Sequence, residues 1–269
     1  MPPFGRRRMG GPRAGARGRR FSPQDPLPEP DDEFDFSDDE EEDPEEDSPD
    51  LASAAEAFTH HTGVVLHARI AEDDEEDEAE QEAKGPVEPR LALRALPVLR
   101  KAILHYPPAV RGGLLRHLHL YGRFQMRGIP FLGSARPRAN RVNLAIRRRT
   151  PMMSLQTTLH HEIGHLICAH PDFPAGRWEA LNTHPYTGRG HRDAEGKSRG
   201  PELWQTGFIS RYASKNRHED FAELAEVAFM HPDRARQAAR QYDVLGRKLD
   251  LLSEAYTRLV PGIDLPWSR

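Results

Sequence analysis

The stretch TTLHHEIGHLICAH, residues 157–170, carries four histidines and one glutamate in fourteen positions. His161 and His165 are four residues apart, which places both imidazoles on one face of an α-helix, one turn from each other. Two imidazole nitrogens in that arrangement can reach one metal ion at about 2.0–2.1 Å. Apolar residues at helical spacing offer a face for burial: Leu155, Leu159, Ile163 and Leu166. The stretch therefore predicts a helix over residues 155–170 that carries part of a metal site.

Glu162 follows the first of the two histidines and lies one step round the helix from it. There its carboxylate can hold an attacking water molecule rather than bind the ion. This H-E-x-x-H pattern is typical of zinc peptidases and favours Glu162 as a general base. A surface helix can also carry these three residues without function. His160 and His170 are not in register with the pair, and we interpret them as polar residues at the surface or behind the ligands. Cys168 lies one turn after His165, and we interpret it as a small core residue rather than a ligand.

The site needs a further ligand, because a catalytic zinc ion has three protein ligands and one open position. The segment YASKNRHEDFAELAEVAF, residues 212–229, has Glu219, Glu223 and Glu226 on one helical face. It is the densest acidic cluster in an otherwise basic region. We expect a second helix over roughly 219–230 that supplies the missing carboxylate; a solvated acidic face on an ordinary helix is the alternative.

HEIGH followed by GFISRYASKNRHEDFAE resembles the anthrax-lethal-factor-like zinc metallopeptidases and the related bacterial zinc-binding metallopeptidases. The segment RWEALNTHPYTG is similar to the part between the two halves of the site in the bacterial group, and the resemblance covers about residues 91–232. It implies one catalytic Zn²⁺ with His161, His165 and Glu219 as ligands. It also implies Glu162 as general base and Tyr212 as a group that assists at the transition state.

Glu223 matches a second glutamate of the same family pattern, and we assign it the role of orienting a histidine ligand. The gap of 54 residues between His165 and Glu219 is long for the family and contains a Gly-, Arg- and His-rich insertion at 188–200. The roles of Glu219 and Glu223 are therefore open to exchange, with Glu223 as the alternative metal ligand.

The resemblance implies a zinc-dependent endopeptidase, in which Glu162 assists the attack of water on a peptide bond. The alternative is a non-catalytic, zinc-containing scaffold or nucleic-acid-associated protein. The basic region, the RRR run at 147–149 and the Arg/Gly-rich N-terminus favour this alternative. Three protein ligands beside Glu162 would favour the peptidase, whereas a fourth protein ligand would favour the scaffold.

Charge is segregated along the 269 residues. Residues 1–82 hold 8 Lys/Arg and 26 Asp/Glu, a net charge of −18, and residues 83–269 have a net charge of +14. The acidic runs at 31–50 and 72–82 bury too little apolar surface to offset chain entropy. We therefore predict a disordered arm over 1–86, first Arg/Gly-rich and then acidic, and a metallopeptidase domain over 87–269. Residues 51–70, the apolar island in the arm, are interpreted as a linker, with a docking element or a transient helix as the alternatives.

The fold class predicted for 87–269 is α+β, a zincin-like domain with a small mixed sheet, an active-site helix and a glutamate-bearing helix. A helix is expected from Pro97 to Tyr106, strands over 114–126 and 141–146, and one or two helices after residue 230. The strand at 141–146 is the expected sheet edge for an extended substrate.

The positive charge of residues 83–269 suggests an acidic partner. Three partners fit this charge: an acidic protein or peptide substrate, the chain's own arm as a cover over the cleft, and nucleic acid. We rank the arm first, because it needs nothing beyond this chain, and nucleic acid is not favoured. Cys168 is the single cysteine, which excludes an intrachain disulfide and a cysteine-rich zinc module. No apolar run reaches the roughly 18 residues of a membrane span, and no secretory signal is evident. We therefore expect a cytoplasmic protein without a membrane partner, with export by a non-classical route left open.

Overall fold

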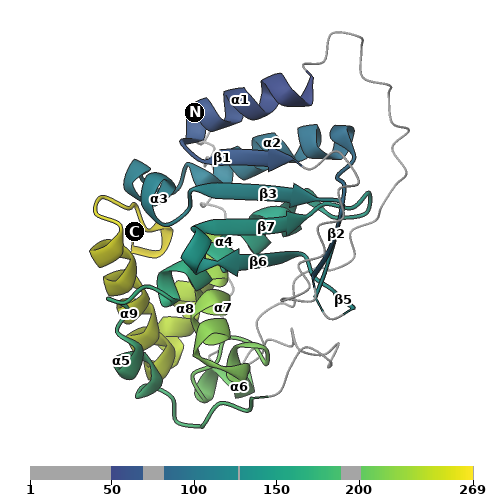
Figure 1. Ribbon diagram of the computed structural model, residues 1–269. Helices are drawn as coiled ribbons and strands as arrows, with labels where there is room; N and C mark the ends of the chain where they lie inside the picture. The colour runs from purple at the N-terminus through teal and green to yellow at the C-terminus, as the bar shows by residue number, and fades with distance from the viewer. Residues whose placement is uncertain (1–49, 69–81, 127, 189–200, 269) are drawn as a thin grey trace, which may run out of the picture. The chain divides into compact units, whose positions relative to one another are not determined.

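A four-stranded mixed sheet supports the candidate site. Its strand order is β1-β3-β7-β6, formed by Val65–Ala68, His117–Tyr121, Arg141–Ala145 and Gly133–Arg136. β1, β3 and β7 run parallel, and β6 pairs antiparallel with β7 at the edge of the sheet (Figure 1). The alternation of β3 and β7 places one apolar row in the core, where Leu118, Leu120, Val142 and Leu144 are fully buried. β7, predicted to be the edge strand, is instead an inner strand, and β6 is the edge strand next to it.

The computed structural model describes residues 50–68, 82–126, 128–188 and 201–268. All of them belong to one compact unit spanning Pro44–Arg269. Most of the predicted arm, residues 1–49 and 69–81, lies outside the described residues, as does most of the 188–200 insertion. Within the described ranges, no helix combines the length and the apolar character needed to cross a bilayer.

Residues 51–68, assigned to the arm from the sequence, are folded. α1 (Leu51–Thr62) begins at Asp50, whose side chain accepts a hydrogen bond from the Ser53 backbone N–H at 2.8 Å. It ends at Gly63, where φ is +71°. β1 then pairs with β3, and Phe58, Val64 and Leu66 are buried. The predicted domain boundary near residue 87 is therefore too late for these residues, because their apolar side chains complete the core.

α2 (Pro89–Ile103) also differs from expectation. Pro89 occupies the start of the helix, and Pro97, predicted to be the first residue, lies inside it on the exposed side. Pro97 removes one backbone hydrogen bond. The apolar spacing nevertheless continues across it and keeps the helix packed, through Leu91, Ala92, Ala95, Leu96, Leu99 and Ile103.

The predicted strand at 114–126 is two strands in two sheets. β3 ends at Tyr121, and β4 (Arg123–Met126) joins β2 (Glu82–Gly85) and β5 (Ile129–Pro130) in a small antiparallel sheet. Gly122 makes the break: a Cβ there would lie 2.0 Å from the Pro86 carbonyl oxygen. Only glycine allows this close approach of the two chains.

Two helices carry the candidate site. α4 (Met152–Cys168) packs against β6 and β7, and α7 (Arg217–Met230) packs against α4 (Figure 1). A Cβ at Gly164 would lie 3.0 Å from Ala222 Cα, so glycine and alanine allow these helices to approach closely. The remaining helices are α3 (Pro108–Gly113), α5 (Ala175–Glu179), α6 (Pro201–Gln205), α8 (Pro232–Gln241), α9 (Asp243–Leu259) and the short η1 (Pro137–Ala139), η3 (Ala213–Lys215) and η4 (Pro266–Ser268). The predicted α+β class, with small sheets and several helices, is confirmed.

Candidate metal centre

α4 presents two imidazoles to the same point. The Nε2 atoms of His161 and His165 lie 3.1 Å apart. One helical turn separates the residues, as the four-residue spacing requires. The buried apolar face of α4 holds this pair in position, with Leu155, Leu159 and Ile163 fully buried.

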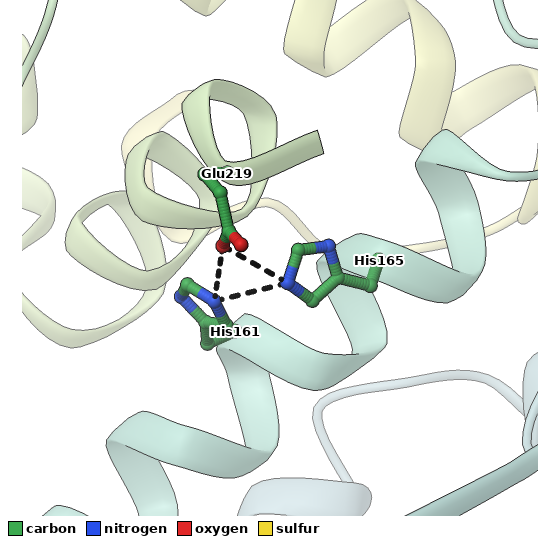
Figure 2. Close-up of side chains that lie close together, drawn as sticks. All are labelled: His161, His165 and Glu219. Carbon is green, nitrogen blue, oxygen red and sulfur yellow. Dashed lines mark hydrogen bonds and ion pairs between the residues drawn. The ribbon is translucent and has the colours of Figure 1, made fainter. Parts of the chain in front are cut away.

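α7 brings Glu219 to the same point from the other side (Figure 2). Its Oε2 lies 3.4 Å from His161 Nε2 and 3.3 Å from His165 Nε2. Asn216 caps α7, and its side chain accepts a hydrogen bond from the Glu219 backbone N–H at 3.0 Å. The cap fixes Glu219 in the first turn, with its carboxylate at the positive end of the helix. We call His161, His165 and Glu219 the ligand triad.

The ligand triad has the dimensions of a zinc site. Its three donor atoms are 3.1–3.4 Å apart, and a tetrahedral ion with bonds of about 2.0–2.1 Å requires separations of about 3.3–3.4 Å. Glu219 Oε2 is buried and receives no hydrogen bond of ordinary geometry from the described residues. A buried carboxylate oxygen aimed at two imidazole nitrogens in this way fits a divalent ion.

The other oxygen of Glu219 is held by the protein. The Tyr212 hydroxyl donates to Oε1 at 2.7 Å, and Lys215 Nζ lies 3.1 Å from it. Burial alone would raise the pKa of Glu219, but its contacts with His161 and His165 hold that pKa well below its usual value. Glu219 is therefore a carboxylate, with Oε1 engaged by donors and Oε2 directed at the histidines.

Glu223 and Glu226 lie on the opposite side of the His161 ring. His161 Nδ1 is 3.5 Å from Glu223 Oε1 and 3.3 Å from Glu226 Oε2. Ser210 Oγ donates to Glu223 Oε2 at 2.7 Å. A carboxylate that accepts the Nδ1 proton leaves the Nε2 lone pair for a metal ion. His161, Glu223 and Glu226 also form a second group able to hold an ion, through Nδ1 rather than Nε2.

Glu162 points into the cleft beside the ligand triad and is 6% exposed. Burial raises the pKa of its carboxyl, whereas the neighbouring His165 and His161 act in the opposite direction. β6 makes the space for this side chain, since a Cβ at Gly133 would lie 2.9 Å from Glu162 Oε1 and 2.5 Å from Thr158 Cγ2. A raised pKa in a carboxyl beside a metal site suits a general base.

Tyr212 contacts both halves of the site. Its hydroxyl holds Glu219, and its ring stacks against His161 with the centroids 6.3 Å apart. Burial and the Glu219 charge raise the pKa of the Tyr212 hydroxyl well above its usual value, so it stays a hydrogen-bond donor.

These residues line a cleft of about 1080 Å³. One wall comes from the chain between Ile129 and Pro137, which includes β6, and another from Arg211–Lys215 and the start of α7. The site is therefore open to a ligand much larger than water.

His160, His170 and Cys168 lie outside the ligand triad, and His160 is buried rather than at the surface. His160 is 1% exposed. Its Nδ1 forms a 2.8 Å hydrogen bond with the Tyr106 hydroxyl, and its ring stacks on Phe229. His170 packs beside Asp172, and Cys168 is buried, which raises the pKa of its thiol to about 12.

Sequence reasoning missed a buried ion pair behind Glu219. Lys248 Nζ lies 2.7 Å from Asp220 Oδ2, and the same oxygen accepts hydrogen bonds from Trp178 Nε1 and the Tyr186 hydroxyl, each at 2.9 Å. Lys248 also donates to the Gly207 carbonyl. These contacts connect Trp178 and Tyr186, which precede the 188–200 insertion, and Gly207, which follows it, to Asp220 in the first turn of α7. Trp178 and Tyr186 belong to the segment RWEALNTHPYTG, which is similar to the bacterial zinc-binding metallopeptidases, but nothing in the local pattern points to Lys248, 28 residues after Asp220.

Residues 138–253 match a family model described as "Putative zinc-binding metallo-peptidase". The matched part contains α4 and α7, and so the whole ligand triad with Glu162 and Tyr212. A crystal structure with the same description, from Bacteroides caccae ATCC 43185, is 13% identical in sequence with a TM-score of 0.49, over 81% of this chain and 88% of that chain. No curated protein matches the chain. The family-model match over residues 138–253 supports the zinc-binding metallopeptidase class, and the likeness to the lethal-factor group stays a prediction.

Proposed function

We propose that the protein is a zinc-dependent endopeptidase whose single catalytic ion is bound by His161, His165 and Glu219. The observation that carries the proposal is the triangle of donor atoms with sides of 3.1–3.4 Å, with Glu162 beside it in an open cleft. The family match over residues 138–253 supports the same class of activity.

Glu219, rather than Glu223, is the third ligand in this proposal. Glu219 Oε2 faces the Nε2 atoms of both histidines, whereas Glu223 faces Nδ1 of His161 only. We assign Glu223 and Glu226 the task of accepting the Nδ1 proton and fixing the ring.

A zinc ion bound to the ligand triad would supply Lewis acidity, which lowers the pKa of water from 15.7 to about 7. Glu162 accepts a proton as water attacks the peptide carbonyl, and then returns it to the leaving amine. The raised pKa of Glu162 suits both steps, because the carboxylate must take a proton and release it near neutral pH.

The substrate binds along β6 in this proposal. Among the described strands β6 pairs only with β7, and Gly133–Arg136 line the cleft. A peptide in extended form can add to such an edge through backbone hydrogen bonds. The Tyr212 hydroxyl donates to Glu219 and lines the same cleft, so a small rotation would direct it at an oxygen that gains charge in the reaction.

Cleavage profiling of a proteome-derived peptide library, with metal analysis of the same samples, tests the proposal. The wild-type chain should contain one zinc and cut peptides. Glu162→Gln should keep the zinc and lose roughly 100-fold or more of the activity. A zinc-loaded wild type that cuts no peptide would contradict the proposal, and loss of zinc in Glu162→Gln would mean that Glu162 has another role.

The scaffold alternative predicts a fourth protein ligand. The group that the described residues form around the two Nε2 atoms has three members, which favours the peptidase.

A further inference from the structure

We infer that Lys215 is a positioning residue for the proposed reaction. Its ammonium group takes over the hydrogen bond to Glu219 when the Tyr212 hydroxyl turns to the substrate. Lys215 belongs to the site already described, so the inference rests on the proposed function and adds one residue to it. The two oxygens of the Glu219 carboxylate, which have different surroundings, carry it.

One oxygen of Glu219 has two donors. The Tyr212 hydroxyl donates to Oε1 at 2.7 Å, and Lys215 Nζ donates to the same oxygen at 3.1 Å. The donors also contact each other, since Lys215 Nζ lies 3.4 Å from the Tyr212 hydroxyl oxygen. Oε2 faces the two histidines instead. If one donor leaves Oε1, the other is already in contact with it.

The backbone holds the two donors beside each other. Tyr212 precedes η3, and the Lys215 backbone N–H donates to the Tyr212 carbonyl at 3.1 Å. Residues three apart in such a tight turn lie above one another. The Lys215 carbonyl accepts from the Gly188 backbone N–H at 3.1 Å, and Lys215 Nζ lies 5.1 Å from the centroid of the Tyr212 ring. The turn and the ring together therefore set the position of the ammonium group.

The Tyr212 hydroxyl cannot serve Glu219 and the substrate at once. A hydroxyl has one proton to donate, and the 2.7 Å contact uses it for Oε1. When the hydroxyl turns to an oxygen that gains charge in the reaction, Glu219 loses its shortest hydrogen bond. Hydrogen bonds to a charged group are among the strong ones, so this loss opposes the turn. The Lys215 ammonium has three protons and can approach Oε1 as the hydroxyl leaves.

Lys215 can make this small movement from where it lies. Its side chain is 21% exposed, and it lines the cleft together with Tyr212 and Glu219. A lysine has a flexible stem, and its charged head keeps contact with water when it is partly exposed. A lysine that only neutralised Glu219 would contact the carboxylate in the same way. Its loss would then act independently of Tyr212, and this difference can be measured.

A double-mutant cycle on the full-length, zinc-loaded chain tests the inference, with Lys215→Met, Tyr212→Phe and the two combined. The probe is a fluorescence-quenched peptide built on the sequence that the wild type cuts best. We expect Lys215→Met to lower kcat by about 10–100-fold, the effect of one hydrogen bond to a charged group. KM should stay close to the wild-type value. In Tyr212→Phe, the added Lys215→Met should lower kcat little further, because no hydroxyl remains to be released.

Zinc affinity, measured by competition with a chelator, should show the opposite pattern. Each single substitution leaves Glu219 Oε1 with one donor, so each should keep the affinity near the wild-type value. The double variant removes both donors that the described residues give to Oε1. It should lose about 10–100-fold in affinity, the usual effect of losing a group that orients a ligand. Lys101→Met is the matched control, because Lys101 is exposed and does not line the cleft, and it should change neither quantity.

An unchanged kcat in Lys215→Met, or an equal fold-loss of kcat in the wild-type and Tyr212→Phe backgrounds, would overturn the inference. A loss of zinc affinity in Tyr212→Phe alone that equals the loss in the double variant would also overturn it. A zinc-loaded wild type that cuts no peptide counts against the proposed function. The zinc affinities of the four proteins then still decide whether Lys215 replaces Tyr212 at Glu219.

Discussion

At the scale of single residues, the two ring nitrogens of His161 face different glutamates, and this difference is the basis of the roles proposed for those glutamates. Nε2 faces Glu219 and Nδ1 faces Glu223 and Glu226. The sequence shows three glutamates at helical spacing, but it does not show which side of an imidazole each one meets. That depends on how far α7 is rotated against α4, which the contact between Gly164 and Ala222 helps to set.

The two glutamates should respond differently to removal. Glu219→Ala should abolish zinc binding, because it deletes a donor atom. Glu223→Ala should weaken binding by about 10–100-fold, the usual effect of losing a group that orients a histidine ligand. Competition with a chelator measures both affinities. Tight zinc binding in Glu219→Ala together with loss in Glu223→Ala would exchange the two roles.

His160 should make stability depend on pH. Burial lowers its pKa to about 3 from an ordinary value of 6.5. The pKa of His160 is lower in the folded state than in the unfolded state, so folding favours the neutral ring. The contribution of His160 to the free energy of unfolding is therefore fully present above about pH 6.5 and falls as the pH drops toward 3. The loss is on the order of 1 kcal/mol per pH unit in that window.

Urea unfolding of metal-free protein between pH 4 and 7 measures this effect. His160→Gln, which cannot take a proton, should show a shallower fall in stability than the wild type. His170→Gln changes an imidazole beside Asp172 near the surface and should follow the wild-type curve. Parallel curves for wild type and His160→Gln would show that His160 does not contribute.

At the scale of elements, β6 sets the position of Glu162, the proposed general base. The sequence stretch GSAR gives little strand signal, so the predicted edge was the more apolar segment at 141–146. β7 is the more apolar strand because it lies inside the sheet, between β3 and β6, and the side chains of residues 142–145 are buried. The edge strand β6 carries small residues instead, because Thr158 and Glu162 of α4 pack closely against it.

Gly133→Ala should therefore reduce catalysis without removing the metal. The added Cβ would lie within 3 Å of Thr158 Cγ2 and Glu162 Oε1, so Glu162 must move. A displacement of about 1 Å costs roughly 100-fold in rate. Steady-state kinetics with metal analysis measures the change, and Gly112→Ala, where a Cβ meets no atom within 4 Å, is the control. Full activity in Gly133→Ala would mean that this packing does not position Glu162.

At the scale of the whole molecule, the folded unit begins earlier than composition indicated. Acidic runs lie on both sides of α1 and β1 in the sequence. The average composition of this region reflects these many charges and gives no sign of the few apolar side chains that are buried. The α4 helix, the β7 strand, the α7 helix and the α+β class could be predicted, since each depends on local periodicity. The β1–β3 pairing and the Asp220–Lys248 ion pair could not, since both join segments distant in the chain.

Two truncations test where the folded unit begins. Deleting residues 1–49 should leave the melting temperature close to that of the full chain. Deleting residues 1–86 removes Phe58, Val64 and Leu66 from the core and β1 from the sheet. Each large apolar side chain contributes about 1.5–3 kcal/mol when buried, so the melting temperature should fall steeply. Equal melting temperatures for the two truncations would return the boundary to residue 87.

The chain that starts at residue 50 is also the appropriate one for asking, at low and high salt, whether the acidic arm inhibits cleavage.

Anomalous diffraction at the zinc absorption edge, from a crystal of the zinc-loaded chain, tests the central claim most directly. We predict one strong peak at about 2.0–2.2 Å from His161 Nε2, His165 Nε2 and Glu219 Oε2, with Glu162 beside it and not bound. A peak bounded by His161 Nδ1, Glu223 and Glu226, or a fourth protein ligand on the ion, would contradict the account.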